Sequence, residues 1–303
     1  MPIYALVLTS PPARPSLGDF AVNRAYSLIP EAQRRAQRWL APGEAWEAEF
    51  ATNEVGGAAR VRAEVAAALN GITLDVNTVV AEPNTRRNRL LVADMESTII
   101  EQECLDELAE FVGKREQIAA TTARAMNGEI GFEDAIKERV AHLAGLDAGA
   151  LQEVYDTRVT LMPGASVLLA TMRNAGARCA LVSGGFTFFT ERIAERLGFD
   201  EHQANRLEIA DGKLTGRVME PILGREAKLA ALERMKKALG LQRALTMAVG
   251  DGANDLDMIG AAGLGVAFRA KPKVAAAADV SIVHGDLTAL LYLQGVTREE
   301  FAS

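Results

Sequence analysis

The segment LLVADMEST, at residues 90–98, is a short apolar run that ends in polar and acidic side chains. Three later runs have a similar form: CALVSGG at 179–185, MAVGDGAND at 247–255 and GLGVAF at 263–268. Segments with helical apolar spacing separate them, such as 165–174 and 225–239. Short, wholly apolar strands that alternate with helices are typical of a parallel sheet covered on both faces. The sequence therefore predicts an α/β fold with a doubly wound parallel sheet.

The composition limits the kinds of partner that the chain can bind. It has 303 residues and a formal net charge of -7, and 5% of its residues are aromatic. An acidic surface repels phosphate backbones, and few aromatic rings are available to stack on bases. We therefore expect no nucleic-acid partner.

The sequence also lacks the signals of a membrane or secreted protein. No apolar run reaches the roughly 20 residues of a membrane span, and residues 1–15 lack the basic-then-apolar order of a signal peptide. Two cysteines, Cys104 and Cys179, cannot form a disulfide framework, and three scattered histidines make a poor metal cluster. We expect a cytoplasmic protein that contacts no membrane.

The chain is expected to divide near residue 85, where the polar segment AEPNTRRNR at 81–89 is typical of a linker. Residues 1–89 contain ten Arg and nine acids, so the acidic surplus lies entirely after them. Before the linker, apolar patterns predict the order strand, helix, strand, strand, helix, strand. This order is similar to that of ACT-like regulatory domains. We predict a small α+β (ACT-like) domain at 1–85 and a second domain at 86–303.

Four carboxylates follow two of the apolar runs. Asp94 and Glu96 come after the first run, and Asp251 and Asp255 come after the third. Ligands bind at the carboxyl ends of parallel strands, so neighbouring strands would bring these four groups together. Like charges raise one another's pKa, and a divalent cation relieves the repulsion. Oxygen ligands without His or Cys favour Mg²⁺ over zinc.

Two further residues could hold a phosphate beside such a metal. Ser183 offers a hydroxyl in a glycine-rich turn, and Lys228 offers a positive charge. Each feature alone has an ordinary structural explanation, such as a helix N-cap, a tight turn or an exposed lysine. The ordered set Asp, Ser, Lys, Asp on successive strands instead favours a carboxylate nucleophile acting on phosphorus.

The segments DMEST, VSGG and GDGANDLDM, together with Lys228, resemble the haloacid dehalogenase (HAD) superfamily of aspartyl phosphatases, and within it the phosphoserine phosphatases. The resemblance covers about residues 89–290. It implies a HAD-like Rossmannoid core with a helical cap inserted at about 104–161. It also implies Mg²⁺-dependent hydrolysis of L-phosphoserine to L-serine and phosphate, the last step of L-serine biosynthesis.

The resemblance further implies a role for each matching residue. Asp94 would be the nucleophile that forms an aspartyl-phosphate, and Glu96 would be the general acid that later activates water. Mg²⁺ would be bound by Asp94, by Asp251 and by the backbone carbonyl of Glu96. Asp255 would support these metal ligands. Ser183 and Lys228 would bind the phosphoryl oxygens, and Gly184 would also belong to the substrate-binding residues. Asn254 would contact phosphate or position water.

Residues that match the family pattern would also bind the charged groups of the substrate. Glu103 would meet the ammonium group and Arg139 the carboxylate, through charge-assisted hydrogen bonds. Met126 and Phe132 would close the cap over the site. Taken singly, Glu103 and Arg139 are more simply explained as exposed helix residues, so their joint spacing from Asp94 carries the prediction.

Glu96 departs from the family pattern, which has Asp at this position. The longer side chain displaces the carboxyl by roughly 1.5 Å, and a 1 Å misplacement can cost about 100-fold in rate. Either a recessed loop lets Glu96 reach normally, or turnover is slow, or the protein accepts phosphate with little turnover. We favour the recessed loop, because the other substrate-reading positions match.

Three other functions stay open at this point. The protein could hydrolyse another small phosphomonoester, act as a Mg²⁺-dependent sensor that accepts phosphate, or bind a regulatory amino acid through residues 1–85. A sugar phosphate would leave Glu103 and Arg139 unpaired, which is costly. No catalytic candidate lies before Asp94. A homodimer is expected from base rates alone.

Overall fold

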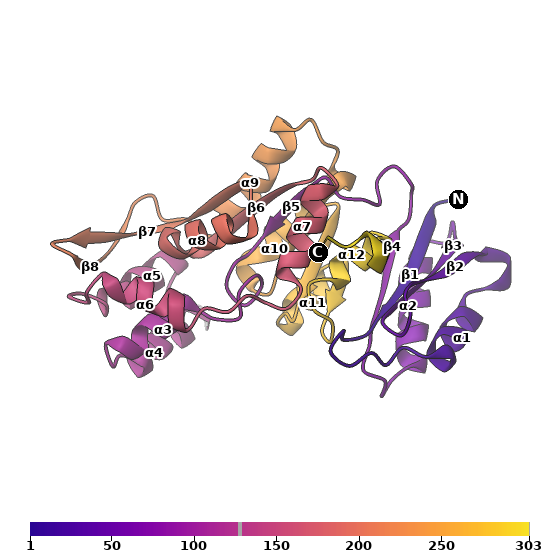
Figure 1. Ribbon diagram of the computed structural model, residues 1–303, viewed down its shortest axis with the longest axis horizontal. Coiled ribbons are helices and arrows are strands. Elements are labelled where there is room, and N and C mark those ends of the chain that lie inside the picture. Colours follow the sequence, from indigo (N-terminus) through magenta and orange to yellow (C-terminus); the bar gives the residue numbers. More distant parts are fainter. Residues whose placement is uncertain (127–128, 303) are drawn as a thin grey trace.

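The computed structural model describes residues 1–126 and 129–302, with only the backbone of Met126. The molecule is elongated, with an N-terminal sheet and its helices at one end, a central sheet, and a group of cap helices at the other end (Figure 1). This arrangement agrees with the predicted α/β fold with an inserted cap and a small N-terminal α+β part.

The N-terminal part is an antiparallel sheet with two helices on one face. The strand order is β2-β3-β1-β4. Its elements are β1 (Ile3–Thr9), α1 (Asp19–Leu28), the 3-10 turn Glu31–Gln33, β2 (Arg34–Ala41), β3 (Ala45–Ala51), α2 (Gly57–Ala68) and β4 (Asp75–Val80). The order of strands and helices matches the prediction.

Strand β1 shows how this sheet is used on both faces. Leu6 and Leu8 pack with the helices α1 and α2, whereas Ala5 and Val7 belong to the apolar cluster of the central part. Successive side chains of a strand point to opposite faces, so the N-terminal sheet lies between its own helices and the core. The division at residue 85 stays a prediction, because this apolar cluster crosses it.

The central sheet has seven strands in the order β11-β10-β9-β5-β6-β7-β8. All neighbours are parallel except β7 and β8. Its strands are β5 (Leu90–Ala93), β6 (Arg178–Phe186), β7 (Glu201–Ala210), β8 (Lys213–Met219), β9 (Thr246–Gly250), β10 (Leu264–Phe268) and β11 (Val280–Ile282). The four apolar runs form β5, β6, β9 and β10, as predicted.

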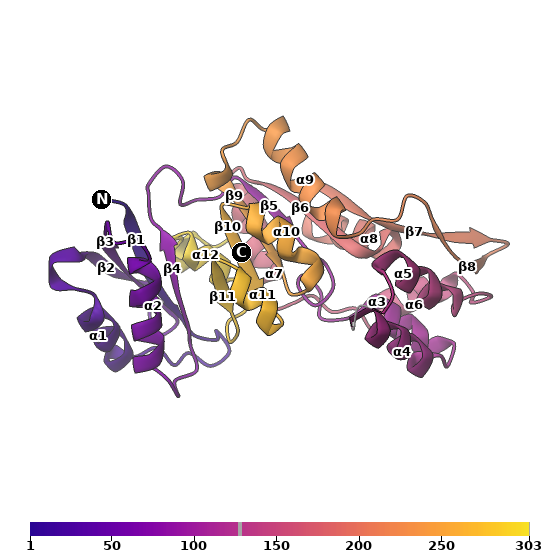
Figure 2. The same cartoon turned by 180° about the vertical axis from the view of Figure 1, so that it is seen from behind.

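Helices cover both faces of this sheet, as Figures 1 and 2 show from opposite sides. Leu91 and Ala93 of β5 pack on the side of α7 and α8, and Leu90 and Val92 pack on the side of α9 and α10. The helices are α7 (Ala165–Asn174), α8 (Thr187–Leu197), α9 (Arg225–Ala238), α10 (Leu256–Ala261), α11 (Pro272–Ala277) and α12 (Ala289–Leu293), with 3-10 turns at Arg243–Leu245, Ala253–Asp255 and Arg298–Glu300.

The cap is inserted between β5 and α7. It consists of α3 (Cys104–Phe111), α4 (Arg115–Met126), α5 (Phe132–Ala141) and α6 (Gly149–Thr157). The two crossing segments meet in a bridge between Ile100 and Leu161. Strands β7 and β8 form a hairpin. Its backbone is hydrogen-bonded to the cap, for example from Gly145 N to Leu214 O at 2.9 Å.

Candidate active site

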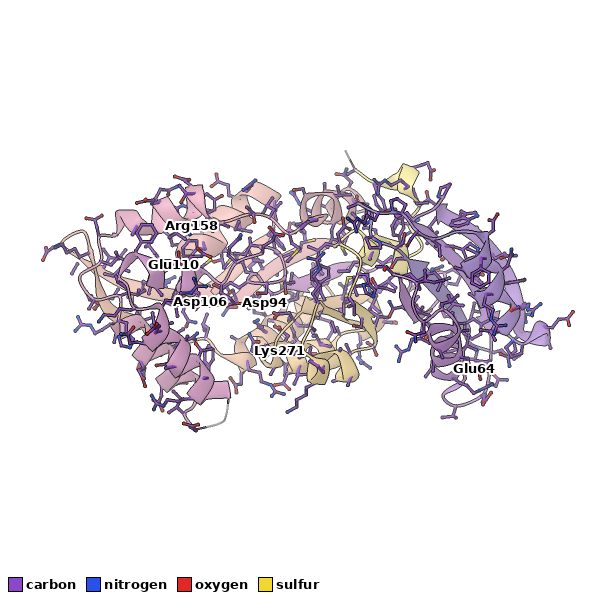
Figure 3. All side chains as sticks on the ribbon, turned by 90° about the horizontal axis from the view of Figure 1, so that it is seen from below. Glu64, Asp94, Asp106, Glu110, Arg158 and Lys271 are labelled. Carbon is purple, nitrogen blue, oxygen red and sulfur yellow. The ribbon has the colours of Figure 1, made fainter. Side chains whose placement is uncertain are left out.

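A cavity of about 460 Å³ lies between the cap and the carboxyl ends of β5, β6 and β9. Eight of the predicted site residues line it: Asp94, Glu96, Glu103, Phe132, Arg139, Gly184, Asp251 and Asn254. Figure 3 labels Asp94 and, near it, Lys271 from the loop after β10. Ser183 and Lys228 are buried, at 2% and 1% exposure, and do not line the cavity themselves. The side chain of Met126 lies outside the described residues.

Three carboxylates form a cluster beneath this cavity. Ligand atoms of Asp94, Asp251 and Asp255 all lie within 4.8 Å of one another. Strand pairing explains why, because the backbone N–H of Asp94 donates to Val249 O of β9 at 3.0 Å, which places the ends of β5 and β9 together. The fourth predicted carboxylate, Glu96, is not part of this cluster.

Lys228 joins two of the three acids. Its Nζ lies 2.7 Å from Asp94 Oδ1 and 2.6 Å from Asp255 Oδ1. Asp255 Oδ2 also accepts a hydrogen bond from Gly252 N at 2.9 Å. Lys228 is therefore fixed at the base of the site as a counter-charge for the acids.

One lysine leaves the carboxylate cluster with an excess of negative charge. Burial and the charge of Asp255 raise the pKa of Asp94 well above its usual value, and the same two causes raise the pKa of Asp251 to about 6. Burial opposes protonation of Lys228, but the charges of Asp94 and Asp255 prevail and raise its pKa. Clustered oxygen donors with surplus negative charge fit a hard divalent cation.

The two oxygens of Asp94 differ in their surroundings. Oδ1 is next to Lys228 and accepts a hydrogen bond from Met95 N at 2.8 Å. Among the described residues, no hydrogen-bond donor contacts Oδ2. A carboxylate held by one oxygen and free at the other is arranged as a nucleophile, because the free oxygen can attack while the bound one fixes its direction.

Glu96 reaches away from the carboxylate cluster toward the cap. Its Oε1 accepts a hydrogen bond from Cys104 N, at the start of α3, at 2.8 Å. Burial and the nearby charge of Glu103 raise the pKa of Glu96 to about 7. A methyl group added at Gly185 would lie 2.8 Å from Glu96 Oε2, so the longer side chain occupies space that this glycine leaves empty.

The remaining predicted residues lie in the glycine-rich segment 183–185, here called the phosphate turn, and in or next to the cap. Ser183 Oγ accepts a hydrogen bond from Gly185 N at 2.9 Å. Glu103 Oε1 accepts one from Ser97 Oγ at 2.8 Å, and Arg139 has no acidic partner among the described residues. Phe132 lies over the phosphate turn, because its ring would be 3.4 Å from a methyl group added at Gly184.

The sequence reasoning did not single out Lys271. Its side chain lines the cavity, and its backbone N–H donates to Asp251 O at 3.2 Å. The sequence signal was its place three residues after the run GLGVAF, near the carboxyl end of a predicted strand. That run seemed to lack polar residues, because the lysine follows it by three positions.

The model of the haloacid dehalogenase-like hydrolase family matches residues 91–259. The chain belongs to this family. Within it, the chain is 45% identical over 240 residues to the phosphoserine phosphatase of Streptomyces coelicolor. The matched region covers 79% of this chain and 58% of that relative. It is 44% identical to that of a Polaromonas species, over 71% of this chain and 94% of the relative. It matches 52% of the phosphoserine phosphatase of Mycobacterium tuberculosis, so it spans little more than half of some relatives.

Solved structures give the same family and a similar arrangement. A probable phosphoserine phosphatase from Vibrio cholerae aligns with a TM-score of 0.75 at 30% identity, over 98% of this chain and 88% of that one. A substrate-bound phosphoserine phosphatase aligns with a TM-score of 0.64 at 38% identity, over 68% of this chain and 98% of that one. Within the described residues, no helix is long and apolar enough to cross a membrane.

Proposed function

We propose that the protein hydrolyses L-phosphoserine to L-serine and phosphate through an aspartyl-phosphate, as the last step of L-serine biosynthesis. The observation that carries the proposal is one cavity lined by Asp94, Glu96, Glu103 and Arg139. In this cavity Asp94 would be the nucleophile and Glu96 the general acid. Glu103 and Arg139 would bind the ammonium and carboxylate groups of the amino acid. Relatives named phosphoserine phosphatase, 44–45% identical to the chain, support the same substrate.

In the first step, Asp94 Oδ2 attacks phosphorus, and the bond between phosphorus and the seryl oxygen breaks. Glu96 gives its proton to that oxygen, so L-serine leaves as a neutral alcohol. A Glu96 pKa of about 7 keeps a large share of this group protonated near neutral pH, as a general acid requires.

In the second step, the ionised Glu96 takes a proton from water, which attacks phosphorus. The bond between phosphorus and Asp94 breaks, phosphate leaves, and both carboxyl groups return to their starting states. Lys228 keeps Asp94 oriented in both steps through Oδ1.

Mg²⁺ is the proposed metal, held by Asp94 and Asp251 with Asp255 behind them. The ligand set is supported by the all-oxygen chemistry of this cluster. When bound, the ion would offset the negative charge that the acids and the phosphate bring together. Glu96 would contribute its backbone carbonyl, since its carboxylate is bonded to Cys104 N instead.

The proposal is tested by phosphate release from L-phosphoserine, phosphotyrosine and glycerol phosphate, with Mg²⁺ and with a chelator. We expect L-phosphoserine to give the highest kcat/KM, and chelation to abolish turnover. Equal rates on the three substrates would contradict the roles of Glu103 and Arg139. One phosphate bound per chain without release would favour the sensor that accepts phosphate.

We also propose a cytoplasmic location, supported by two free cysteines that are both buried. A homodimer is proposed from base rates. Light scattering of the purified chain measures its mass in solution.

A further inference from the structure

Asn205 lies where β7 passes from the core to the hairpin. It pairs with Phe186 at the end of β6, after a shift in register from Val182. The next residue, Arg206, already pairs with Met219 of β8. The Asn205 side chain is 1% exposed, and nothing in the proposed reaction has yet used it.

Its amide group contacts two separate segments. Nδ2 donates to Gly184 O at 2.9 Å and to Leu223 O at 3.2 Å. Oδ1 accepts from Leu223 N at 2.7 Å. Both amide hydrogens and the carbonyl oxygen are thus used, which fixes the orientation of the side chain.

The two segments carry the two groups proposed to hold phosphate. Gly184 belongs to the turn that presents Ser183, and Leu223 lies just before α9, which carries Lys228. No strand pairing joins the two segments directly in the described sheet. One buried amide therefore joins the phosphate turn (residues 183–185) to the segment that leads into α9.

We propose that Asn205 is a positioning residue for phosphate binding, which holds the Ser183–Gly184 turn in register with the segment that leads to Lys228. The inference rests on the proposed function only in assigning phosphate to these two elements. It does not depend on which alcohol the phosphate is attached to.

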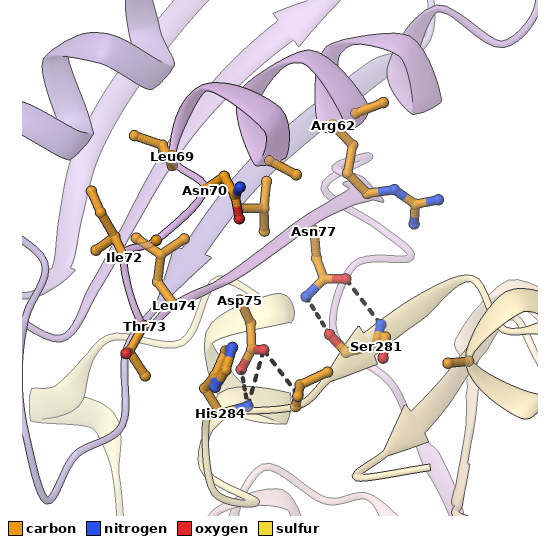
Figure 4. Close-up of a pocket in the computed structure, with 16 residues that line it drawn as sticks. Arg62, Leu69, Asn70, Ile72, Thr73, Leu74, Asp75, Asn77, Ser281 and His284 are labelled. Atoms are coloured by element: carbon orange, nitrogen blue, oxygen red, sulfur yellow. Dashed lines mark hydrogen bonds between the residues drawn. The ribbon is translucent and has the colours of Figure 1, made fainter. Parts of the chain in front are cut away.

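The chain offers a matched control in Asn77 (Figure 4). This asparagine is 2% exposed, and it also clamps a backbone, with Nδ2 donating to Ser281 O and Oδ1 accepting from Ser281 N, both at 3.0 Å. It joins β4 to β11 and does not line the active-site cavity. Loss of its donor should therefore affect stability without moving the phosphate turn.

The experiment compares Asn205→Asp with Asn77→Asp in the full chain. Each substitution keeps size and one acceptor but replaces the donating amide by a carboxylate next to carbonyl oxygens. We measure kcat and KM for L-phosphoserine and for p-nitrophenyl phosphate, the inhibition constant of inorganic phosphate, and the melting temperature. Asn205→Ser is the second variant, should the aspartate prevent folding.

For Asn205→Asp we expect phosphate inhibition to weaken by about tenfold and kcat/KM to fall by about 100-fold on both substrates. Asn77→Asp should lower the melting temperature and leave these constants unchanged. A loss of folded protein alone would lower kcat while KM and the inhibition constant stay the same, and this result would overturn the inference. Equal kinetic losses in both variants would also overturn it.

Failure of the proposed substrate would look different. The wild-type chain would then not prefer L-phosphoserine, while Asn205→Asp would still weaken phosphate inhibition and p-nitrophenyl phosphate turnover.

Discussion

At the scale of single residues, the site separates its two reactive carboxyl groups by their partners. Asp94 lies against a buried lysine, whose charge opposes the rise in the pKa of Asp94 that burial and Asp255 cause. Glu96 is buried beside another acid and bonded to the first turn of the cap, so its proton is retained to higher pH. Two carboxyl groups two positions apart therefore have different partners. We propose different tasks for them: the one beside the lysine attacks phosphorus, and the one beside the cap transfers the proton.

Replacing Asp94 by Asn should reduce turnover of L-phosphoserine by at least about 1,000-fold, the scale expected for a lost covalent nucleophile. The fold should persist, because the amide removes one charge from a cluster with too many. Phosphate release and circular dichroism check the two statements. Substantial residual turnover in folded protein would contradict the covalent mechanism.

The second prediction at this scale concerns the length of the acid. The Glu96 carboxyl reaches Cys104 N through its full length and fills the space beside Gly185. We expect Glu96→Asp to give no gain in kcat, because the shorter arm loses this contact. Glu96→Gln keeps the length but not the proton, and should lower kcat by about 100-fold or more.

These variants also distinguish the three explanations for a Glu in place of Asp at position 96: a recessed loop, slow turnover, or phosphate acceptance with little turnover. A large gain in kcat for Glu96→Asp would contradict the recessed-loop interpretation and indicate an impaired acid in the parent. Single-turnover kinetics identify which step has changed.

At the scale of elements, the loops after the parallel strands carry the chemistry. The loop after β10 contributes the exposed residue Lys271, whose charge is near enough to Asp251 to oppose the rise in the pKa of that acid. It lines the same cavity as several acids. A positive charge in this place attracts a dianionic substrate over a long range.

We expect Lys271→Gln to lower kcat/KM by about tenfold at low ionic strength. The loss should shrink as salt is added, because screening weakens long-range attraction. Lys273→Gln is the control, since Lys273 is also exposed and lies two residues further on, in the first turn of α11, but does not line the cavity. A loss that is independent of salt would contradict an electrostatic role.

The strands that are buried on both faces were the easiest to predict from the sequence. Strands β5, β6, β9 and β10 were recognisable because parallel strands buried on both faces are continuously apolar. Strand β11 has three residues, and β7 begins with the largely polar segment EHQAN, so neither β11 nor the first half of β7 was predicted as a strand. Asp94, Asp251 and Ser183 were found from local motifs, whereas Asn205 and Lys271 act through contacts that only the folded chain brings together.

At the scale of the whole molecule, the N-terminal part is joined to the core by polar as well as apolar contacts. Both carboxylate oxygens of the buried Asp75 accept backbone hydrogen bonds from residues 283–285 (Figure 4). Tyr292 Oη donates to Glu44 Oε1 at 2.7 Å. The apolar cluster that includes Ala5 and Val7 also includes Leu290 and Leu293.

Deletion of residues 1–85 should therefore preserve the catalytic groups but lower the melting temperature, because it exposes apolar side chains of the core. Activity per folded molecule and thermal unfolding measure the two effects. Asp75→Ala in the full chain tests the junction without truncation, and should lower the free energy of unfolding by about 1–3 kcal/mol. An unchanged melting temperature in both variants would contradict a structural role for this junction.

Strand β7 belongs to two parts of the molecule at once. Its first half is a parallel strand of the core, and its second half forms the hairpin to which the cap is hydrogen-bonded. Because the cap is hydrogen-bonded to this hairpin, it cannot rotate about its two crossing segments alone. The ribbon of β7 and β8 must bend with it. We expect the stiffness of that ribbon to limit how far the cap can move away from the core.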